Sequence, residues 1–325
     1  MTKKKNEEVE IKEKNISNEN NSTDEEQNPK NKTAQMFVDF WDKAGSFHHT
    51  NKLWGYPTLF EEYDKLTSGL QKSELTVVAA RHSMGKTTFI TNIASALISQ
   101  KIPVLYISYK LSEEKIVNRF LSAEAEVNNI KIKQNTLSSK DWEKISEAIN
   151  RIAPNGENSI LEILGECNLS YAQLFDKIRE FKIKNEDGVV IIDDFQLIPL
   201  TGKEDRYAEL SALACSIKRL AVEIKLPIVL TAQVSRKCEE RNDKRPQLSD
   251  LSECDALAQY SDNLLFIYRD DYYYKEDDRE YGEIKRDVAE IIVAKHKNGP
   301  RGKFELLFMP HISKYKNPIK SSEIF

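Results

Sequence analysis

The sequence predicts an α/β fold in which helices cover both faces of a mainly parallel β-sheet. Apolar runs with the length of buried strands, at residues 75–80, 104–109, 188–193 and 227–232, alternate with stretches of helical spacing. Later apolar runs, near 264–268, 289–294 and 304–308, follow one another more directly, which predicts antiparallel pairing at one edge of the sheet. Helices are expected after residue 85 and at 113–126, 139–152, 170–184 and 204–225.

Composition narrows the class of protein. No apolar run approaches the roughly 18 residues that span a bilayer, and the N-terminus lacks the apolar core of a signal peptide, so we expect a soluble, cytoplasmic protein. The four cysteines are widely separated and form no Cys-x-x-Cys pair, which argues against a zinc site or a disulfide framework. Because the net charge is −4, any binding to nucleic acid must depend on local basic patches.

The chain is expected to divide into three parts. Residues 1–32 are rich in Lys, Glu and Asn and lack aromatic residues, so they are predicted to form a disordered tail. Within residues 33–50, a helix from Thr33 to Ala44 carries the apolar stripe Phe37, Phe40, Trp41 and Ala44, and Gly45 is a candidate stop. This helix packs either on its own domain or on a neighbouring subunit. Residues 51–325 form the main domain.

The strand at 75–80 leads into a candidate phosphate-binding loop. In the sequence Gly85-Lys86-Thr87, the glycine permits close approach of the backbone to an oxyanion, Lys86 can reach the β- and γ-phosphate oxygens, and the Thr87 hydroxyl can ligate Mg²⁺. The generic motif has another glycine where this chain has Ala80, but the strand before and the helix after support the assignment. The residues assigned to ATP are Arg81, Ser83, Met84, Gly85, Lys86, Thr87 and Thr88.

A second part of the site is expected at the ends of two later strands. The run 189–192 delivers Asp193 and Asp194 to a strand's carboxyl end, where ligands bind in open α/β sheets. Asp193 can hold Mg²⁺ opposite Thr87, whereas two aspartates in this place can also cap the next helix. Gln233, at the end of the following strand, is a candidate sensor of the γ-phosphate.

From residue 55 to residue 308 the chain resembles the C-terminal, RecA-like motor domain of the DnaB family of replicative helicases. The resemblance implies a ring, usually a hexamer, that binds ATP between subunits and moves single-stranded DNA through a central channel. The helix at 33–44 resembles the family's linker helix, a full N-terminal domain is not expected, and a helicase loader or a primase is a candidate partner. The segments that carry the resemblance are GYPTLFEEYDKLTSGLQ, VVAARHSMGKTTF, PVLYIS, DWEKISEAI, VVIIDDFQLI, AQVSRKCEERNDKRPQLSDL, LLFIYRDDYY and AEIIVAKHKNGPRG.

The chain departs from the family at two catalytic positions. Where the family has a glutamate that orients the attacking water, this chain has Lys110, and a protonated lysine cannot accept the proton of water. Asp194 is a candidate substitute. The family's trans-acting Lys-Gln-Arg becomes Lys295-His296-Lys297, and a lysine lacks the planar bidentate fork of an arginine. Lys295 and Lys297 are therefore predicted to act more weakly on the adjacent subunit's ATP.

A third departure concerns DNA. The family's Asp-Leu-Arg-Glu-Ser-Gly reads Asp-Leu-Ser-Glu-Cys-Asp at 250–255, which removes a phosphate-binding arginine and adds a carboxylate. Neighbouring basic residues can compensate, although such a charge run is also typical of a solvated loop. The candidate DNA-binding residues are Arg236, Arg241, Lys244, Arg245 and Glu253.

Two functions from different classes follow. The first is an ATP-dependent DNA helicase or translocase acting in DNA replication. The second is a degenerate ATP-binding ring protein with a scaffolding or regulatory role and little or no unwinding, which the three departures motivate. A recombinase-like or clock-like ATPase agrees less well with the segments after Gln233.

Overall fold

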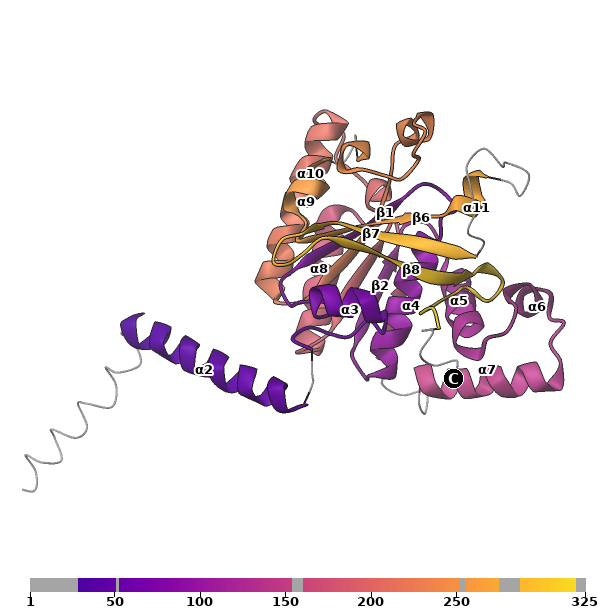
Figure 1. The fold of residues 1–325 in the computed structure, drawn as a ribbon, viewed down its shortest axis with the longest axis horizontal. Helices are drawn as coiled ribbons and strands as arrows, with labels where there is room; N and C mark the ends of the chain where they lie inside the picture. The colour runs from indigo at the N-terminus through magenta and orange to yellow at the C-terminus, as the bar shows by residue number, and fades with distance from the viewer. Residues whose placement is uncertain (1–28, 51–52, 154–159, 252–254, 275–286, 320–325) are drawn as a thin grey trace, which may run out of the picture. The chain divides into compact units, whose positions relative to one another are not determined.

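The computed structural model describes residues 29–50, 53–153, 160–251, 255–274 and 287–319 (Figure 1). The chain divides into a unit that ends at Trp54 and a compact unit that begins at Gly55. The predicted tail at 1–32 falls largely outside the described residues, and the part that is described, 29–32, is helical. Described below are first the helix of the N-terminal unit and then the sheet of the larger unit.

The N-terminal unit contains one long helix, α2 (Pro29–Thr50), which is longer than predicted. It begins four residues before Thr33, because proline is favoured in the first turn of a helix. It continues through Gly45, so the predicted stop at that glycine is wrong; a glycine inside a helix costs only about 1 kcal/mol relative to alanine. Phe37 and Trp41 are 73% and 77% exposed, and Phe40 stacks on Trp54 with 5.2 Å between ring centroids.

The larger unit is built on a mixed sheet with the order β3-β2-β4-β5-β1-β6-β7-β8-β9 (Figure 1). The strands from β3 to β6 pair in parallel and those from β6 to β9 pair antiparallel, as the sequence predicted. The strand bounds are β1 Leu75–Ala80, β2 Val104–Ser108, β3 Leu161–Leu164, β4 Val189–Asp193, β5 Ile228–Gln233, β6 Asn263–Tyr268, β7 Val288–His296, β8 Gly302–Met309 and β9 Lys314–Lys316.

The predicted helices are present, and shorter ones accompany them. Ser138 and Ser170 begin α7 and α8 with capping boxes, which explains why these two helices start where the sequence indicates. The helix bounds are α3 Glu61–Thr67, α4 Lys86–Ser99, α5 Glu113–Ala125, α6 Asn129–Gln134, α7 Ser139–Ile152, α8 Tyr171–Lys184, α9 Arg206–Ile224, α10 Asp255–Tyr260 and α11 Asp270–Tyr273, with 3₁₀ turns η3 Phe195–Leu197, η4 Arg236–Glu240, η5 Leu248–Asp250 and η7 Pro310–Ile312.

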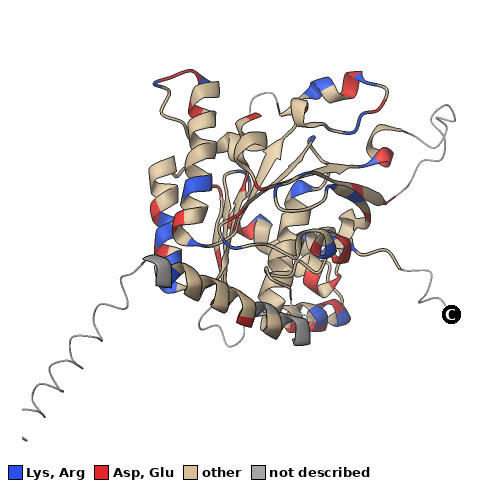
Figure 2. Ribbon diagram, turned by 60° about the vertical axis from the view of Figure 1, so that its left-hand side comes forward, with Lys and Arg blue, Asp and Glu red and all other residues tan. Residues whose placement is uncertain are grey.

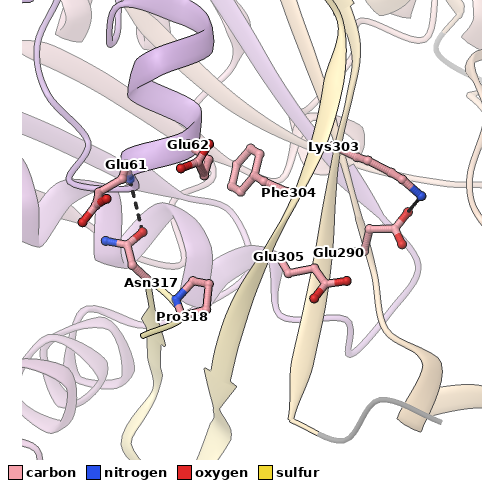
Figure 3. A pocket seen from close by; sticks show the side chains of 8 residues that line it. All are labelled: Glu61, Glu62, Glu290, Lys303, Phe304, Glu305, Asn317 and Pro318. Carbon is pink, nitrogen blue, oxygen red and sulfur yellow. Dashed lines mark hydrogen bonds and ion pairs between the residues drawn. The ribbon is translucent and has the colours of Figure 1, made fainter. Parts of the chain in front are cut away.

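Charged residues of both signs are interspersed along the described surface helices (Figure 2). The antiparallel strands and α3 enclose one hollow of about 430 Å³, in which the carboxylate of Glu290 faces the Lys303 ammonium at 3.8 Å (Figure 3). This hollow also contains Glu61, Glu62 and Glu305, so its lining is mostly acidic and does not suit a phosphate-bearing ligand. A nucleotide site must be sought elsewhere.

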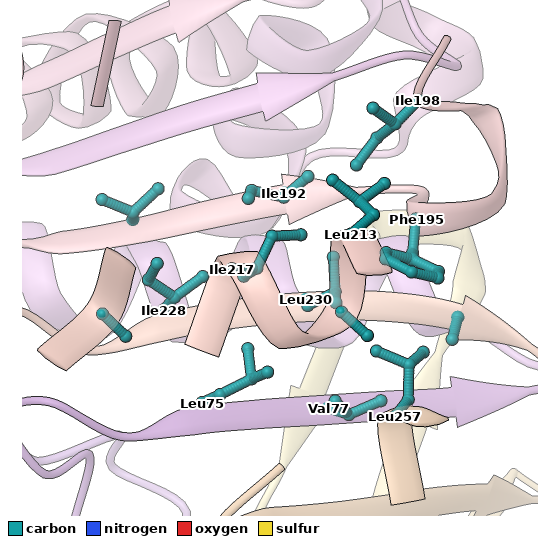
Figure 4. Close-up of a cluster of buried hydrophobic side chains, with 14 of the residues drawn as sticks. Leu75, Val77, Ile192, Phe195, Ile198, Leu213, Ile217, Ile228, Leu230 and Leu257 are labelled. Atoms are coloured by element: carbon teal, nitrogen blue, oxygen red, sulfur yellow. The ribbon is translucent and has the colours of Figure 1, made fainter. Parts of the chain in front are cut away.

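The sheet is covered on both faces by apolar packing. Along β1, Val77 and Ala79 face one core and Val78 and Ala80 face the other, because successive side chains of a strand point to opposite faces. The first core contains side chains from α8, α9 and α10 (Figure 4), and the second contains side chains from α3, α4 and α5. Burial on both faces fixes the register of the central strands and therefore the positions of the polar residues at their ends.

Candidate functional site

The candidate phosphate-binding loop lies between β1 and α4, as the sequence predicted. Ala80 ends β1 in register with Gln233 at the end of β5. Ser83 and Gly85 have positive φ angles of 61° and 100°, and α4 begins directly afterwards at Lys86. The loop therefore brings the N-terminus of a 14-residue helix to the carboxyl edge of the parallel strands, which is the environment that favours an anion.

Gly85 is also required by packing that the sequence did not predict. A Cβ atom at this position would lie 2.2 Å from the hydroxyl oxygen of Tyr315 and 3.1 Å from the ring of Phe308. The buried Tyr315 hydroxyl donates a hydrogen bond to the carbonyl of Met84 at 3.1 Å, and the Asn92 side chain bonds the backbone of Ser313 and Tyr315. The loop and α4 are thus anchored to the C-terminal hairpin β8–β9.

Lys86 is buried, with 6% of its surface exposed. Its ammonium donates to the carbonyls of Ala80 at 2.8 Å and Arg81 at 3.3 Å. Burial lowers the pKa of Lys86 to about 8, although the nearby carboxylates of Asp194 and Asp193 act in the opposite direction. This lysine is held beside two carboxylates at the base of the loop, where an additional anion would favour its charged form.

Thr87 and Asp193 lie together across the sheet, as the sequence predicted. The Thr87 hydroxyl donates to one oxygen of Asp193 at 3.1 Å, and the Thr231 hydroxyl donates to the other oxygen at 2.6 Å. Asp193 is 1% exposed. A hydroxyl and a carboxylate in contact are oxygen donors of the kind that Mg²⁺ prefers. Outside the gaps given above, no cluster of three or more His, Cys, Asp or Glu could hold a metal, so the phosphates would have to complete the coordination shell.

Asp194 is fully buried beside this pair. One carboxylate oxygen accepts a hydrogen bond from the Gln233 side chain at 2.9 Å, and the other has no hydrogen-bond partner within the described part of the chain. Burial raises the pKa of Asp194, and the positive charges of Lys86 and Lys110 act in the opposite direction. In the described residues its side chain makes no capping bond to η3, so the alternative capping role does not apply to Asp194.

Lys110 follows β2, whose last residue Ser108 is in register with Asp193. Its side chain is exposed, and its charge contributes to the lowered pKa of Lys86. The structure therefore places the lysine that replaces the expected glutamate next to the candidate site.

The other loop residues assigned to ATP are placed less simply. The guanidinium of Arg81 is bound to Glu239 at 2.8 Å and to the carbonyl of Val234 at 2.8 Å. The Met84 side chain belongs to the apolar core, and the buried Thr88 hydroxyl accepts a bond from Arg119 at 3.4 Å. Arg81 and Met84 thus have only their backbone groups free of these contacts, whereas the Ser83 side chain is exposed.

Sequence reasoning missed His82 and Gln196. Burial and the charges of Lys86, Lys110, Arg81 and Arg236 lower the pKa of the exposed His82. Gln196 exchanges two hydrogen bonds of 3.1 Å with the backbone of Gln233. The position of His82 inside the loop was a usable signal, but nothing local to Gln196 indicated its partner 37 residues away.

Lys295 and Lys297 lie at the opposite edge of the sheet from the loop. Lys295 is in register with Leu264, which pairs with Val77 near the start of β1. The Lys295 ammonium donates to the carbonyls of Ala258, Gln259 and Ser261 at the end of α10, and burial lowers its pKa. The Lys297 ammonium is 3.7 Å from Asp262. Neither lysine can serve the loop of its own chain, and their action on another subunit stays a prediction.

The basic run after β5 is largely engaged within the chain. Arg241 makes two bonds of 2.7 Å to Asp250, and Arg245 binds Glu290 at 3.0 and 3.1 Å. The Lys244 ammonium lies 5.2 Å from the ring centroid of Tyr273. Arg236 is exposed, and Glu253 lies outside the described residues. The assignment of these residues to DNA stays a prediction, and it is strongest for Arg236.

The loop, the threonine–aspartate pair and the mixed sheet define a RecA-like ATPase fold of the phosphate-loop class. The chain belongs to the DnaB-like helicase C terminal domain family, whose model matches residues 55–317. The resemblance read from the sequence is thereby confirmed.

Particular relatives support this family. The chain is 35% identical over 286 residues to the replicative DNA helicase DnaB of Geobacillus stearothermophilus, covering 87% of this chain and 61% of the relative. A solved helicase-type ATPase domain aligns with a TM-score of 0.79 and 31% identity over 88% of this chain and 98% of that one. A DnaB-like replicative helicase, studied with its interactions with primase, aligns with a TM-score of 0.77 and 31% identity over 88% and 66%.

Within the described segments, we find no helix that is both long enough and apolar enough to span a membrane.

Proposed function

We propose that this protein is an ATP-dependent motor of the replicative helicase type that moves along single-stranded DNA. The observation that carries the proposal is the contact between Thr87 and Asp193, 3.1 Å apart, beside the buried ammonium of Lys86. A hydroxyl, a carboxylate and an ammonium that converge at the N-terminus of α4 are the groups that Mg²⁺ and the phosphates of ATP require.

In this mechanism Lys86 exchanges the carbonyls of Ala80 and Arg81 for phosphate oxygens. Thr87 and Asp193 would hold Mg²⁺, which supplies neutralisation of the charge that develops on the phosphates. Backbone groups from Arg81 to Thr88 bind the phosphates, since a helix N-terminus presents unpaired N–H groups there. Gln233 senses the γ-phosphate through its contact with Asp194.

Asp194 replaces the missing glutamate as the general base. Its unpartnered oxygen is the described acceptor beside Asp193 that remains free for a water molecule. In the reaction the water gives its proton to this oxygen as its own oxygen attacks the γ-phosphorus, and ADP leaves with the electrons of the broken P–O bond. Lys110 stabilises the carboxylate by charge and takes no proton.

The arrangement also requires a second subunit. Because Lys295 and Lys297 lie at the edge opposite the loop, a head-to-tail ring, here a hexamer, brings them to the ATP of the adjacent subunit. The exposed apolar side chains of α2 provide the docking surface between neighbours. A motor of this kind acts in the cytoplasm, and a helicase loader or a primase is a natural partner for it.

A second function is favoured by the two catalytic substitutions. Lys110 cannot act as a base while protonated, and Lys297 cannot make the bidentate contact of an arginine. A ring that binds ATP without turnover would serve as a scaffold. In that case the loop and Asp193 would still bind nucleotide, and Asp194 would have no catalytic role.

One assay separates the two functions. ATP turnover is measured with and without single-stranded DNA for the wild type, Lys86→Ala and Lys110→Glu, with the exposed Lys101→Ala as a control for loss of a surface lysine. The motor predicts DNA-stimulated turnover that Lys86→Ala abolishes and Lys101→Ala leaves unchanged. Turnover that is absent in the wild type and appears in Lys110→Glu would support the scaffold instead.

A further inference from the structure

A cavity of about 480 Å³ lies next to the candidate nucleotide site and is distinct from it. Its lining includes Arg81 and His82 from the loop after β1, but Lys86 and Thr87 do not contribute to it. The remaining walls come from the segments that follow β4 and β5, at the carboxyl edge where ligands of such sheets bind. Those walls are made by Gln196, Leu197, Arg206, Gln233, Val234, Ser235, Arg236 and Asp250.

The charge of this cavity is positive after its internal ion pairs are counted. Arg81 is paired with Glu239 at 2.8 Å, and Asp250 is paired with Arg241 at 2.7 Å. Arg206 and Arg236 are exposed and supply the remaining charge. Arg206 is also the first residue of the 19-residue helix α9, whose N-terminus adds a partial positive charge. The cavity therefore suits a phosphate group.

Hydrogen bonds connect this cavity to the buried carboxylate of the nucleotide site. Arg206 donates to the carbonyl of Gln196 at 3.1 Å. The side chain of Gln196 both donates to the Gln233 carbonyl and accepts from the Gln233 backbone N–H, each at 3.1 Å. Gln233 in turn donates to Asp194 at 2.9 Å. A shift of Arg206 toward an anion can thus move Gln196 and Gln233.

We propose that the cavity formed by His82, Arg206 and Arg236 binds a backbone phosphate of single-stranded DNA, and that Gln196 transmits its occupancy to Asp194. The proposal rests on the proposed motor function. It assigns to Arg206 and Arg236 the phosphate contact that the substitution of serine at position 252 removes. Gln196 is a positioning residue, because it acts on Asp194 through Gln233.

The phosphate contact is tested by binding of a fluorescently labelled oligothymidylate to the full chain at several salt concentrations. Arg206→Gln and Arg236→Gln should each weaken binding several-fold and reduce the slope of log K against log salt by about 0.7. Arg206→Lys should retain most of the affinity because it keeps the charge. Lys237→Gln is the matched control, since Lys237 is exposed beside Arg236 but does not line the cavity.

The connection to the nucleotide site is tested by ATP turnover of Gln196→Ala. The ratio of DNA-stimulated to basal kcat should fall at least threefold, while the KM for ATP and the affinity for oligothymidylate stay within twofold of the wild type. A purely structural role for Gln196 would lower both rates together, and thermal unfolding monitors that outcome.

The outcomes distinguish the two proposals. If the wild type binds oligothymidylate but Arg206→Gln binds no more weakly than Lys237→Gln, the cavity proposal is wrong and the motor function stands. If stimulation by DNA is intact in Gln196→Ala, the transmission is wrong. If the wild type neither binds oligothymidylate nor hydrolyses ATP, both the cavity proposal and the motor function are overturned.

Discussion

The two edges of the sheet each hold a buried carboxylate, but the two carboxylates meet different partners. At the edge that precedes β1, Asp262 accepts a bond of 2.8 Å from the Leu75 backbone and pairs with Lys218 and Lys297. At the opposite edge, one oxygen of Asp194 has no partner among the described residues. A buried acceptor without a partner is costly, and it is retained where function needs it. The difference indicates that the carboxyl edge is the one prepared for chemistry.

The largest expected effect comes from removing the unpartnered carboxylate. Asp194→Asn should lower kcat for ATP by roughly 10²–10⁴-fold, the range that general-base catalysis supplies. The affinity for Mg²⁺-ATP should change little, because Asp193 and Thr87 are retained. Asp193→Asn is the matched comparison, and it should weaken Mg²⁺-ATP binding first. Turnover and binding of a fluorescent ATP analogue measure the two effects.

The fold of Asp194→Asn serves as the control. The substitution removes a buried charge and keeps a side chain that can bond Gln233, so the free energy of unfolding should stay within about 1 kcal/mol of the wild type. Unchanged turnover in a folded Asp194→Asn protein would show that Asp194 is not the base, and the contrast between the two edges would lose its catalytic meaning.

The contact between Thr87 and Asp193 could be predicted from the sequence for a physical reason. The run before Asp193 and the run before the loop are both continuous apolar strands, and parallel strands deliver their carboxyl ends to the same edge. The pairing of Arg241 with Asp250 and of Arg245 with Glu290 could not be predicted. A charge run has no period that identifies its partners, and the partners were chosen by tertiary packing.

The packing of Tyr315 against Gly85 also had no local signal. The two residues are 230 positions apart, and the glycine already had a sufficient explanation in the phosphate loop. The four-residue strand β3 was missed because it is short and only partly buried. These omissions lie at contacts between distant segments, whereas the apolar pattern within each segment was enough to predict the central strands.

The second prediction concerns the edge that carries Lys297, which is 62% exposed. Lys297→Ala should lower turnover by about tenfold, less than the loss of an arginine finger, because a lysine makes a weaker contact with the transition state. If Lys297 acts on the neighbouring subunit, a mixture of Lys297→Ala and Lys86→Ala proteins should be more active than the sum of the two. About a quarter of the interfaces in random mixed rings then join an intact Lys86 to an intact Lys297.

The mixing experiment has a clear opposite result. If Lys297 acted within its own chain, each mixed ring would contain only damaged sites, and the mixture would show no gain. Size-exclusion chromatography of the two variants provides the control, since both must still assemble into the same oligomer for the comparison to hold.

The smallest effect is expected at the hairpin that supports the phosphate loop. Glu126, after α5, binds Lys314 at 2.7 Å and Lys316 at 2.9 Å on β9, next to the Tyr315 that contacts the loop. The hydrogen bonds from these lysines lower the pKa of Glu126 from 4.5 to about 2. Because the folded pKa is below the unfolded one, the stabilisation is complete above pH 4.5 and is lost as the pH falls toward 2.

Glu126→Gln should therefore destabilise the protein near pH 7 by only about 0.5–1 kcal/mol, because the carboxylate is 44% exposed and solvent screens the pair. The difference from the wild type should shrink as the pH falls from 4.5 toward 2, as measured by urea unfolding. Glu147→Gln, which removes an exposed carboxylate from α7, should show no such pH dependence. A difference for Glu126→Gln that is constant across this range would mean that the ion pairs do not anchor the hairpin, and that the loop depends on Tyr315 and Asn92 alone for its support.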